Sequence, residues 1–187
     1  MRYLLVFLVL YTSLVASRDG GPYLGFGYGI SQYDDNQYYS NIEETNAKSS
    51  TFYAGAYINK YLSVELSHVS FDAQGLSDGF LVTNSSSAEE LINFSATTIS
   101  TLAHYPFFDD KIDTYLRFGA GEMGSNIAGE SGFTLVYGVG IAYRFNDMFE
   151  TKIAYDSYQF GLDTNNDKSS DYKMQLNYLY MAIEVQF

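Results

Sequence analysis

The sequence predicts an all-β fold: an eight-stranded antiparallel up-and-down transmembrane β-barrel. Polar and apolar residues alternate with a period of two in one segment after another, the pattern of strands with one apolar face. Long and short connections between these segments alternate along the chain. An apolar N-terminal segment is typical of exported proteins.

The N-terminal segment, residues 1–17, has the features of a secretory signal peptide. A short apolar run follows Arg2, and small residues precede the cleavage site that we expect between Ser17 and Arg18. The apolar run is shorter than the ~20 residues that a helix needs to span a bilayer. We then expect residues 18–187 to form a single β-barrel domain.

The strands follow from the alternation. In the first, Leu24, Phe26, Tyr28 and Ile30 alternate with glycines and small residues. Most other segments show the same two faces, although the fourth has no clear phase. We expect strands at residues 22–33, 50–58, 61–71, 92–105, 112–123, 133–145, 149–160 and 174–187.

The connections indicate how these strands are arranged. The longer ones are residues 34–49, 72–91, 124–132 and 161–173, and they alternate with short turns near residues 59–60, 106–111 and 146–148. In an up-and-down meander all long connections fall at one end and all short turns at the other, together with both termini. Outer-membrane barrels are built in this way, with short periplasmic turns and long extracellular loops.

Composition excludes several other classes of protein. There is no cysteine, which rules out disulfides and cysteine-based metal sites. The formal net charge of -12 argues against nucleic-acid binding, which depends on clustered Lys and Arg. A hydrophobic fraction of 47% argues against disorder.

The more polar strand face suits a narrow barrel interior. An eight-stranded barrel is just wide enough inside for side chains, so glycines would make room and opposite charges would neutralise one another. The apolar face would then contact lipid. A soluble lipocalin-like carrier, with its apolar face inside, is the alternative. The charged residues on the polar face are Glu65, Arg117, Arg144, Lys152, Asp156 and Glu184.

Aromatic residues cluster near the expected strand ends. A tyrosine at a membrane–water boundary keeps its ring in the apolar layer and its hydroxyl in water. An aromatic-rich soluble core is the alternative explanation. The residues are Tyr23, Tyr33, Tyr57, Tyr61, Tyr105, Phe107, Phe108, Phe145, Phe149, Tyr158 and Phe160.

The last strand ends in phenylalanine, with apolar residues at alternate positions before it. This pattern is similar to the signal by which bacterial barrels are recognised for membrane insertion. The residues are Leu179, Met181, Ile183, Val185 and Phe187.

Several motifs in order resemble the outer-membrane β-barrel domain family, the group of small OmpA-like, OmpX-like and opacity-type barrels. They are GPYLGFGYGIS, AGAYINKYLSVELSHVSF, HYPF, TYLRFGAG, YGVGIAYRFND and LYMAIEVQF, which span nearly all of residues 18–187. The resemblance implies an eight-stranded barrel with a closed or narrow polar interior, and it does not fix one activity.

The resemblance also implies an ion pair inside the barrel. In OmpA-like barrels an inward glutamate on the third strand pairs with basic residues across the lumen, and Glu65 occupies the matching place. Arg117 is then the first candidate partner, with Lys152 and Glu184 as further members. The network would either neutralise a polar core or act as a gate.

Evidence for enzyme chemistry is weak. His68 and Ser70 share a strand face, a spacing also used by lipid A deacylases. The wider sequence does not match that family, so we expect no enzyme, and neither a cofactor nor a metal. Gly-x-Gly runs are not followed by a helix pattern, and we interpret them as strand positions facing a tight lumen.

The sequence therefore predicts an integral protein of the Gram-negative outer membrane, with both termini in the periplasm and a structural or surface-interaction role. A narrow pore for small solutes or ions and a lipid A-modifying enzyme are the alternatives. Expected partners are outer-membrane lipid and lipopolysaccharide, the barrel-insertion machinery, and a host or surface partner of a monomeric barrel. The last would bind through residues 34–49, 72–91, 124–132 and 161–173.

Overall fold

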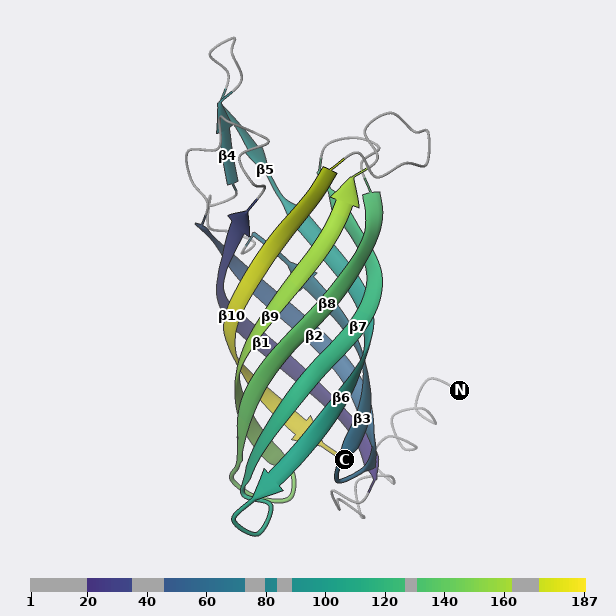
Figure 1. The fold of residues 1–187 in the computed structure, drawn as a ribbon. Helices are drawn as coiled ribbons and strands as arrows, with labels where there is room; N and C mark the ends of the chain where they lie inside the picture. The colour runs from purple at the N-terminus through teal and green to yellow at the C-terminus, as the bar shows by residue number, and fades with distance from the viewer. Residues whose placement is uncertain (1–19, 35–45, 73–79, 84–88, 127–130, 163–171) are drawn as a thin grey trace, which may run out of the picture.

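The structure is a computed structural model that describes residues 20–34, 46–72, 80–83, 89–126, 131–162 and 172–187. These residues form a closed antiparallel barrel with the strand order β1-β10-β9-β8-β7-β6-β3-β2 (Figure 1). Each barrel strand pairs with the next barrel strand along the chain, so that β3 pairs with β6, and β1 closes the barrel against β10. The predicted eight-stranded barrel is confirmed. The predicted signal peptide and its cleavage site at Ser17 and Arg18 lie outside the described residues.

The eight barrel strands lie close to the predicted positions. Six are 14 residues long; five of them are longer than predicted, and β6 has the predicted length. They are β1 (Gly21–Asp34), β2 (Asn46–Asn59), β3 (Leu62–Ser70), β6 (Phe94–Phe107), β7 (Ile112–Ser125), β8 (Ser131–Arg144), β9 (Phe149–Leu162) and β10 (Tyr172–Gln186).

The connection expected at residues 72–91 is not all loop. It contains a separate antiparallel hairpin of β4 (Phe80–Thr83) and β5 (Glu89–Ile92), which stands beyond the barrel rim in Figure 1. The other long connections are also shorter than predicted, because the barrel strands continue into them. Exposed residues that the structure describes in these extensions, such as Asp34, Asn46 and Ser131, are polar, so the apolar alternation does not mark these ends of the strands.

The two ends of the barrel differ in their connections. One end, here the turn end, carries the three short connections together with the start of β1 and the end of β10 (Figure 1). Asn59 and Asn146 each close one turn there, because their side-chain Oδ1 accepts backbone N–H bonds at 2.8–2.9 Å. The other end, here the loop end, carries the long connections.

The third short turn has an unusual backbone. The Lys111 amide donates to the Phe108 carbonyl at 3.3 Å, and the central residues Asp109 and Asp110 have φ of 55° and 63°. Positive φ at both central positions defines a type I′ turn, which matches the twist of a hairpin but favours Asn-Gly. Phe108 itself also has a positive φ of 50°.

Alternation along the strands separates two faces, as predicted. On β1 the side chains of Leu24, Phe26 and Ile30 point outward and are 40–60% exposed, whereas Tyr23 and Ser31 point inward and are buried. The same phase holds around the barrel. The barrel is therefore apolar outside where it would meet lipid, and the reversed, lipocalin-like arrangement is not observed.

Candidate functional site in the barrel interior

The centre of the barrel interior is an ion cluster around Arg117 of β7. Its guanidinium pairs with Glu65 of β3 and, at 2.6 Å, with Asp156 of β9. All three side chains are buried. The cluster therefore ties three strands together across the lumen.

Every donor of this guanidinium is used. Besides the two carboxylates, Nε donates to Ser100 Oγ at 3.2 Å, Nη2 to Ser67 Oγ at 2.9 Å, and Nη1 to Tyr180 Oη at 3.4 Å. These five bonds match the five N–H groups of arginine. Since an unpaired buried charge is costly, this full pairing is what makes the guanidinium tolerable in the interior.

A second cluster lies nearer the turn end. Lys152 of β9 pairs with Glu184 of β10 and lies 3.8 Å from Glu150. Arg144 of β8 approaches Glu150 at 3.8 Å and donates to Gln186 at 3.2 Å. The Lys152 ammonium also faces three tyrosine rings at 5.2–5.5 Å, those of Tyr23, Tyr53 and Tyr115.

The structure thus distributes the predicted charged residues between two clusters. Glu65, Arg117 and Asp156 meet at the centre, whereas Lys152, Glu184 and Arg144 meet nearer the turn end. Arg144 is the most exposed of the six, at 13% of its side chain. Sequence reasoning missed Glu150, although its position two residues before Lys152 puts it on the same strand face.

Sequence reasoning also missed a chain of hydrogen bonds around His104 of β6. His104 Nδ1 lies 2.6 Å from Asp113 Oδ2, and Nε2 lies 2.8 Å from Ser63 Oγ. Tyr23 Oη lies 3.3 Å from the same serine and donates to Glu65 at 3.2 Å. The phase of the fourth predicted strand was unclear, so the sequence could not place His104 inside.

Inward glycines make room for the tyrosine rings of this region. A Cβ added at Gly55 would overlap the ring of Tyr23, which is its direct partner across β1 and β2. The same relation holds for Gly25 with Tyr53 and for Gly140 with Tyr115. The predicted role of the Gly-x-Gly runs in a tight lumen fits these contacts.

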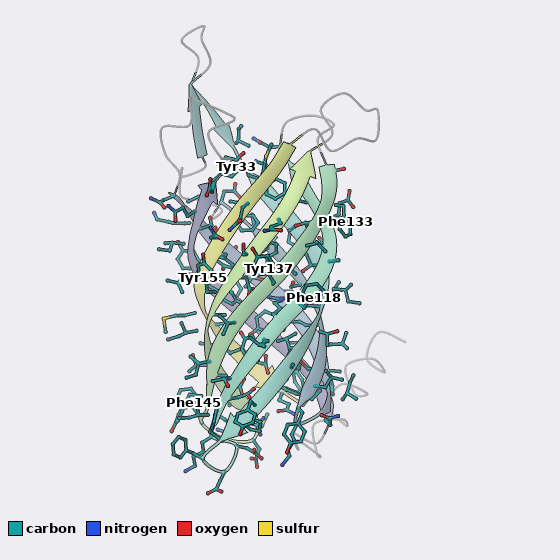
Figure 2. All side chains as sticks on the ribbon, viewed as in Figure 1. Tyr33, Phe118, Phe133, Tyr137, Phe145 and Tyr155 are labelled. Atoms are coloured by element: carbon teal, nitrogen blue, oxygen red, sulfur yellow. The ribbon has the colours of Figure 1, made fainter. Side chains whose placement is uncertain are left out.

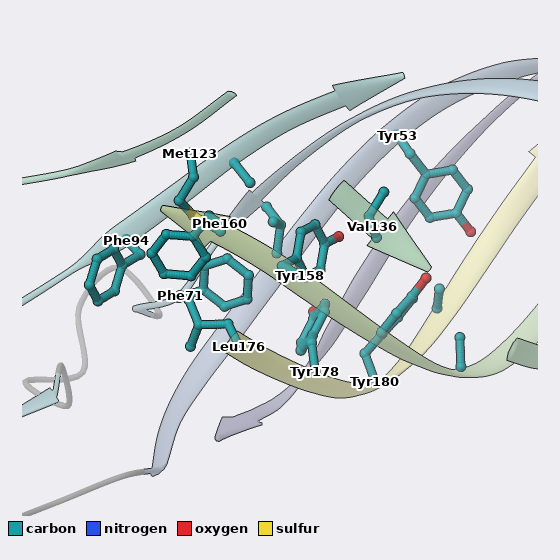
Figure 3. Packing of buried hydrophobic residues seen from close by; sticks show 14 of the residues in the cluster. Tyr53, Phe71, Phe94, Met123, Val136, Tyr158, Phe160, Leu176, Tyr178 and Tyr180 are labelled. Carbon is teal, nitrogen blue, oxygen red and sulfur yellow. The ribbon is translucent and has the colours of Figure 1, made fainter. Parts of the chain in front are cut away.

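Toward the loop end the interior is not polar. Buried side chains there form what we call the plug: Phe71, Phe94, Met123, Tyr158, Phe160, Leu176 and Tyr178 (Figure 3). The rings of Phe71 and Tyr158 pack edge to face at 5.4 Å, and those of Phe94 and Phe160 lie 5.5 Å apart. The interior is polar as predicted over most of the barrel's height, and it is largely apolar only at the loop end.

The outer surface changes character at the level of the plug. Strands of 14 residues at ~3.4 Å each, tilted by ~40°, rise about 36 Å, whereas an apolar band of such barrels is about 25 Å tall. The excess lies at the loop end, where most outward residues are polar; Phe133 on β8 is an exception. This polar collar comprises Gln32, Lys48, His68, Thr97, Glu122, Gln159 and Gln175.

Collar and plug residues are neighbours in sequence. Glu122 precedes Met123, Gln159 precedes Phe160, and Gln175 precedes Leu176. The barrel is therefore apolar outside and polar inside over most of its height, and largely polar outside and apolar inside at the loop end. Such a reversal is expected where the wall of a barrel rises above a hydrocarbon layer.

The aromatic prediction is partly wrong. Tyr23, Tyr33, Tyr57, Tyr158 and Phe160 are buried inside, because their strand positions share the phase of the lumen. The other six point outward near the turn end, and Figure 2 shows Phe145 among them. Phe133, labelled toward the loop end in the same view, was not among the predicted boundary aromatics. The outward six are Tyr61, Tyr105, Phe107, Phe108, Phe145 and Phe149.

The C-terminal apolar residues lie on the outer face of β10. Leu179, Met181 and Ile183 are 46–64% exposed, and Val185 is partly covered. Phe187 follows the strand, and its amide donates to the Pro22 carbonyl at 2.9 Å. Their role in insertion stays a prediction.

His68 and Ser70 each bond to another residue rather than to one another. His68 Nδ1 lies 2.9 Å from Thr97 Oγ1, while the Ser70 hydroxyl donates to Asp72. Within the described ranges, no group of three or more His, Cys, Asp or Glu residues could hold a metal ion. No helix among the described residues is long and apolar enough to cross a membrane.

A family model agrees with the geometry. The model described as "Outer membrane protein beta-barrel domain" matches residues 3–179, which is most of the chain. No curated protein matches the sequence.

Solved structures share the fold at low sequence identity. Neisserial surface protein A is 14% identical, with a TM-score of 0.62 over 89% of this chain and 97% of that one. Ail, the attachment invasion locus protein of Yersinia pestis, is 15% identical, with a TM-score of 0.56 over 90% and 99%. The outer membrane protein OprG of Pseudomonas aeruginosa is 12% identical, with a TM-score of 0.53 over 92% and 99%.

Proposed function

Because the chain belongs to the outer membrane protein beta-barrel domain family, we propose that it is a sealed, non-enzymatic barrel that presents its long connections at the cell surface. Its location in the outer membrane and its structural or surface role follow from the family. We further propose that the lumen is sealed, that the turn end faces the periplasm and that the long connections bind a partner.

The interior supports the seal. A solute entering from the turn end meets the buried Arg117 cluster, and beyond it the plug, where Phe71 and Leu176 have no exposed surface. Passing both layers would require breaking buried ion pairs and displacing packed rings. This double obstruction is the observation that carries the proposal, and it argues against the alternative of a pore.

The outer surface supports the orientation. At the turn end, outward aromatics such as Tyr105 and Phe145 lie among apolar residues, whereas the loop end carries the polar collar. Outer-membrane barrels have short periplasmic turns and long extracellular loops. We therefore propose that the turn end, with both chain ends, faces the periplasm.

The net charge of the long connections indicates what kind of partner they could bind. Acidic residues outnumber basic ones in each of residues 34–49, 72–91, 124–132 and 161–173. Ail of Yersinia pestis has been crystallised with the heparin analogue sucrose octasulfate, but repulsion would oppose such an anion here. We propose a partner with a basic surface, and lipopolysaccharide as the surrounding lipid.

Two introduced cysteines would test location and orientation together, since the chain has none of its own. Asn126→Cys lies at the loop end and Asp147→Cys in a turn at the other end, and both side chains are exposed. In intact cells a membrane-impermeant maleimide should label Asn126→Cys only. Asp147→Cys should become labelled only after the outer membrane is permeabilised.

Fractionation supplies the control for this experiment. The protein should sediment with the outer membrane and migrate differently on a gel before and after boiling. Labelling of Asp147→Cys in intact cells would contradict the orientation. A soluble protein without a mobility shift would contradict the membrane location itself.

A further inference from the structure

Four consecutive contacts connect the turn end of the lumen with the central cluster. They join Asp113 to His104 at 2.6 Å, His104 to Ser63 at 2.8 Å, Ser63 to Tyr23 at 3.3 Å, and Tyr23 to Glu65 at 3.2 Å. All five side chains are buried. Each contact needs one hydrogen, and these hydrogens can be counted.

A neutral His104 supplies too few hydrogens. His104 Nδ1 must carry its hydrogen toward Asp113, since a carboxylate only accepts. Tyr23 gives its single hydrogen to the Glu65 carboxylate, which pairs with Arg117. Ser63 is left with one hydrogen and two neighbours, Tyr23 Oη and His104 Nε2, that could both only accept. One of the four contacts would then be a repulsion between lone pairs.

One additional proton satisfies the whole chain. If His104 carries hydrogens on both ring nitrogens, Nε2 donates to Ser63, Ser63 donates to Tyr23, and Tyr23 donates to Glu65. The proton could formally sit on Asp113 instead, but an imidazole is intrinsically more basic than a carboxylate. We infer that His104 is an imidazolium in the folded barrel, and that its proton completes a one-directional hydrogen-bond chain ending on Glu65.

The groups that face His104 are compatible with a positive charge. The aromatic rings of Tyr57 and Tyr115 lie 5.1 Å and 5.7 Å from the imidazole. Tyr57 in turn donates to Glu184 at 3.4 Å. Among the described charges of the lumen, one more cation reduces the acidic excess. The acids are Glu65, Asp113, Glu150, Asp156 and Glu184, and the bases are Arg117, Arg144 and Lys152.

The direction of the bonds separates this chain from a hydrolase site. Ser63, His104 and Asp113 have the order of a Ser-His-Asp triad, in which the histidine accepts the serine proton. Here the serine hydrogen is committed to Tyr23, so His104 donates to Ser63 rather than activating it. Ser63 is also fully buried, so no substrate carbonyl reaches its hydroxyl.

The hydrogen-bond chain from Asp113 to Glu65 couples the protonation of His104 to the ion cluster in the middle of the barrel. Loss of the His104 proton removes one hydrogen, so either Ser63 or Tyr23 must turn away from its neighbour. Tyr23 holds the Glu65 oxygen that Arg117 does not use. The protonation state of His104 therefore affects the hydrogen bonding of Glu65 in the central ion cluster, about three hydrogen bonds away.

Nitrogen NMR of the folded protein in nanodiscs tests this inference. The chain has only two histidines, and His68, which is exposed and bonded to a neutral threonine, is the internal reference. A His68→Gln variant assigns the signals. At neutral pH both ring nitrogens of His104 should give the signals of protonated nitrogen, and raising the pH until they change should move the Tyr23 ring signals with them.

A Ser63→Ala variant separates coupling from proximity. It removes the contact that is short of a hydrogen, so His104 should lose its second proton at a lower pH than in the wild-type protein, and the Tyr23 signals should no longer follow the histidine. One unprotonated ring nitrogen on His104 of the wild-type protein at neutral pH would overturn the inference. So would Tyr23 signals that follow His104 equally well in the Ser63→Ala variant.

Discussion

Replacing Arg117 by methionine should destabilise the barrel more than any other single charge removal in the lumen. The change keeps most of the side-chain volume but leaves Glu65 and Asp156 buried without the cation between them. It also removes the donors that bond Ser67, Ser100 and Tyr180. Breaking a buried pair from one side typically costs about 3–5 kcal/mol.

The size of this effect can be read from urea unfolding of the protein folded in lipid vesicles. With a urea dependence of about 2 kcal/mol per molar, a loss of about 4 kcal/mol lowers the unfolding midpoint by about 2 M. Arg144→Met is the matched control, because that side chain lies at the turn end, 3.8 Å from Glu150. A partly exposed pair of this kind contributes about 0–1 kcal/mol.

A triple variant tests whether the loss comes from charge or from packing. Glu65→Gln and Asp156→Asn combined with Arg117→Met remove every charge of the central cluster with little change in shape. Replacing a whole buried ion cluster by neutral groups is often tolerated, so the triple variant should be more stable than Arg117→Met alone. The reasoning fails if Arg117→Met unfolds at the same urea concentration as Arg144→Met.

Three further changes act on packing and on the turn. Gly55→Ala should lower stability by about 1–3 kcal/mol, because its methyl would displace Tyr23. Gly124→Ala, with open space around it, should leave stability unchanged. Urea unfolding midpoints of the two variants test this difference. Asp110→Gly should raise stability by about 0.5–1 kcal/mol at its φ of 63°, measured against the parent midpoint; a lower midpoint would contradict that expectation. Phe71→Ala should cost about 3–5 kcal/mol by opening a cavity in the plug, and an unchanged midpoint would show that the plug is loosely packed.

The fold was predictable because the membrane imposes a period of two on every strand. Where outward residues meet lipid, as at Phe26 or Ile183, alternation alone gives the strand, its phase and the side on which its charges lie. The inward position of Glu65, Arg117 and Lys152 follows from that phase.

The partners inside the barrel were harder to predict, because they depend on stagger between strands. The sequence does not say that Arg117 of β7 meets Asp156 of β9 while Lys152 meets Glu184. These pairings are set by barrel shear and tilt, which no single strand records.

The inward aromatic residues at the loop end were not predicted from the sequence, for a different reason. There the wall rises above the hydrocarbon layer, so Phe160 and Leu176 point inward while Gln159 and Gln175 point outward. An analysis that assigns apolar residues to lipid places such aromatics at the membrane boundary. The reversal can be recognised only once the height of each residue in the barrel is known.

Conductance in planar lipid bilayers tests the central claim, that two layers seal the lumen, most directly. The wild-type barrel should show no discrete current steps. We expect conductance from a triple variant that carries Phe71→Ala and Phe160→Ala in the plug and Glu65→Gln in the central cluster. The double plug variant and the single Glu65→Gln variant should each conduct less than the triple variant. Regular current steps from the wild-type protein would contradict a sealed interior and would favour a pore.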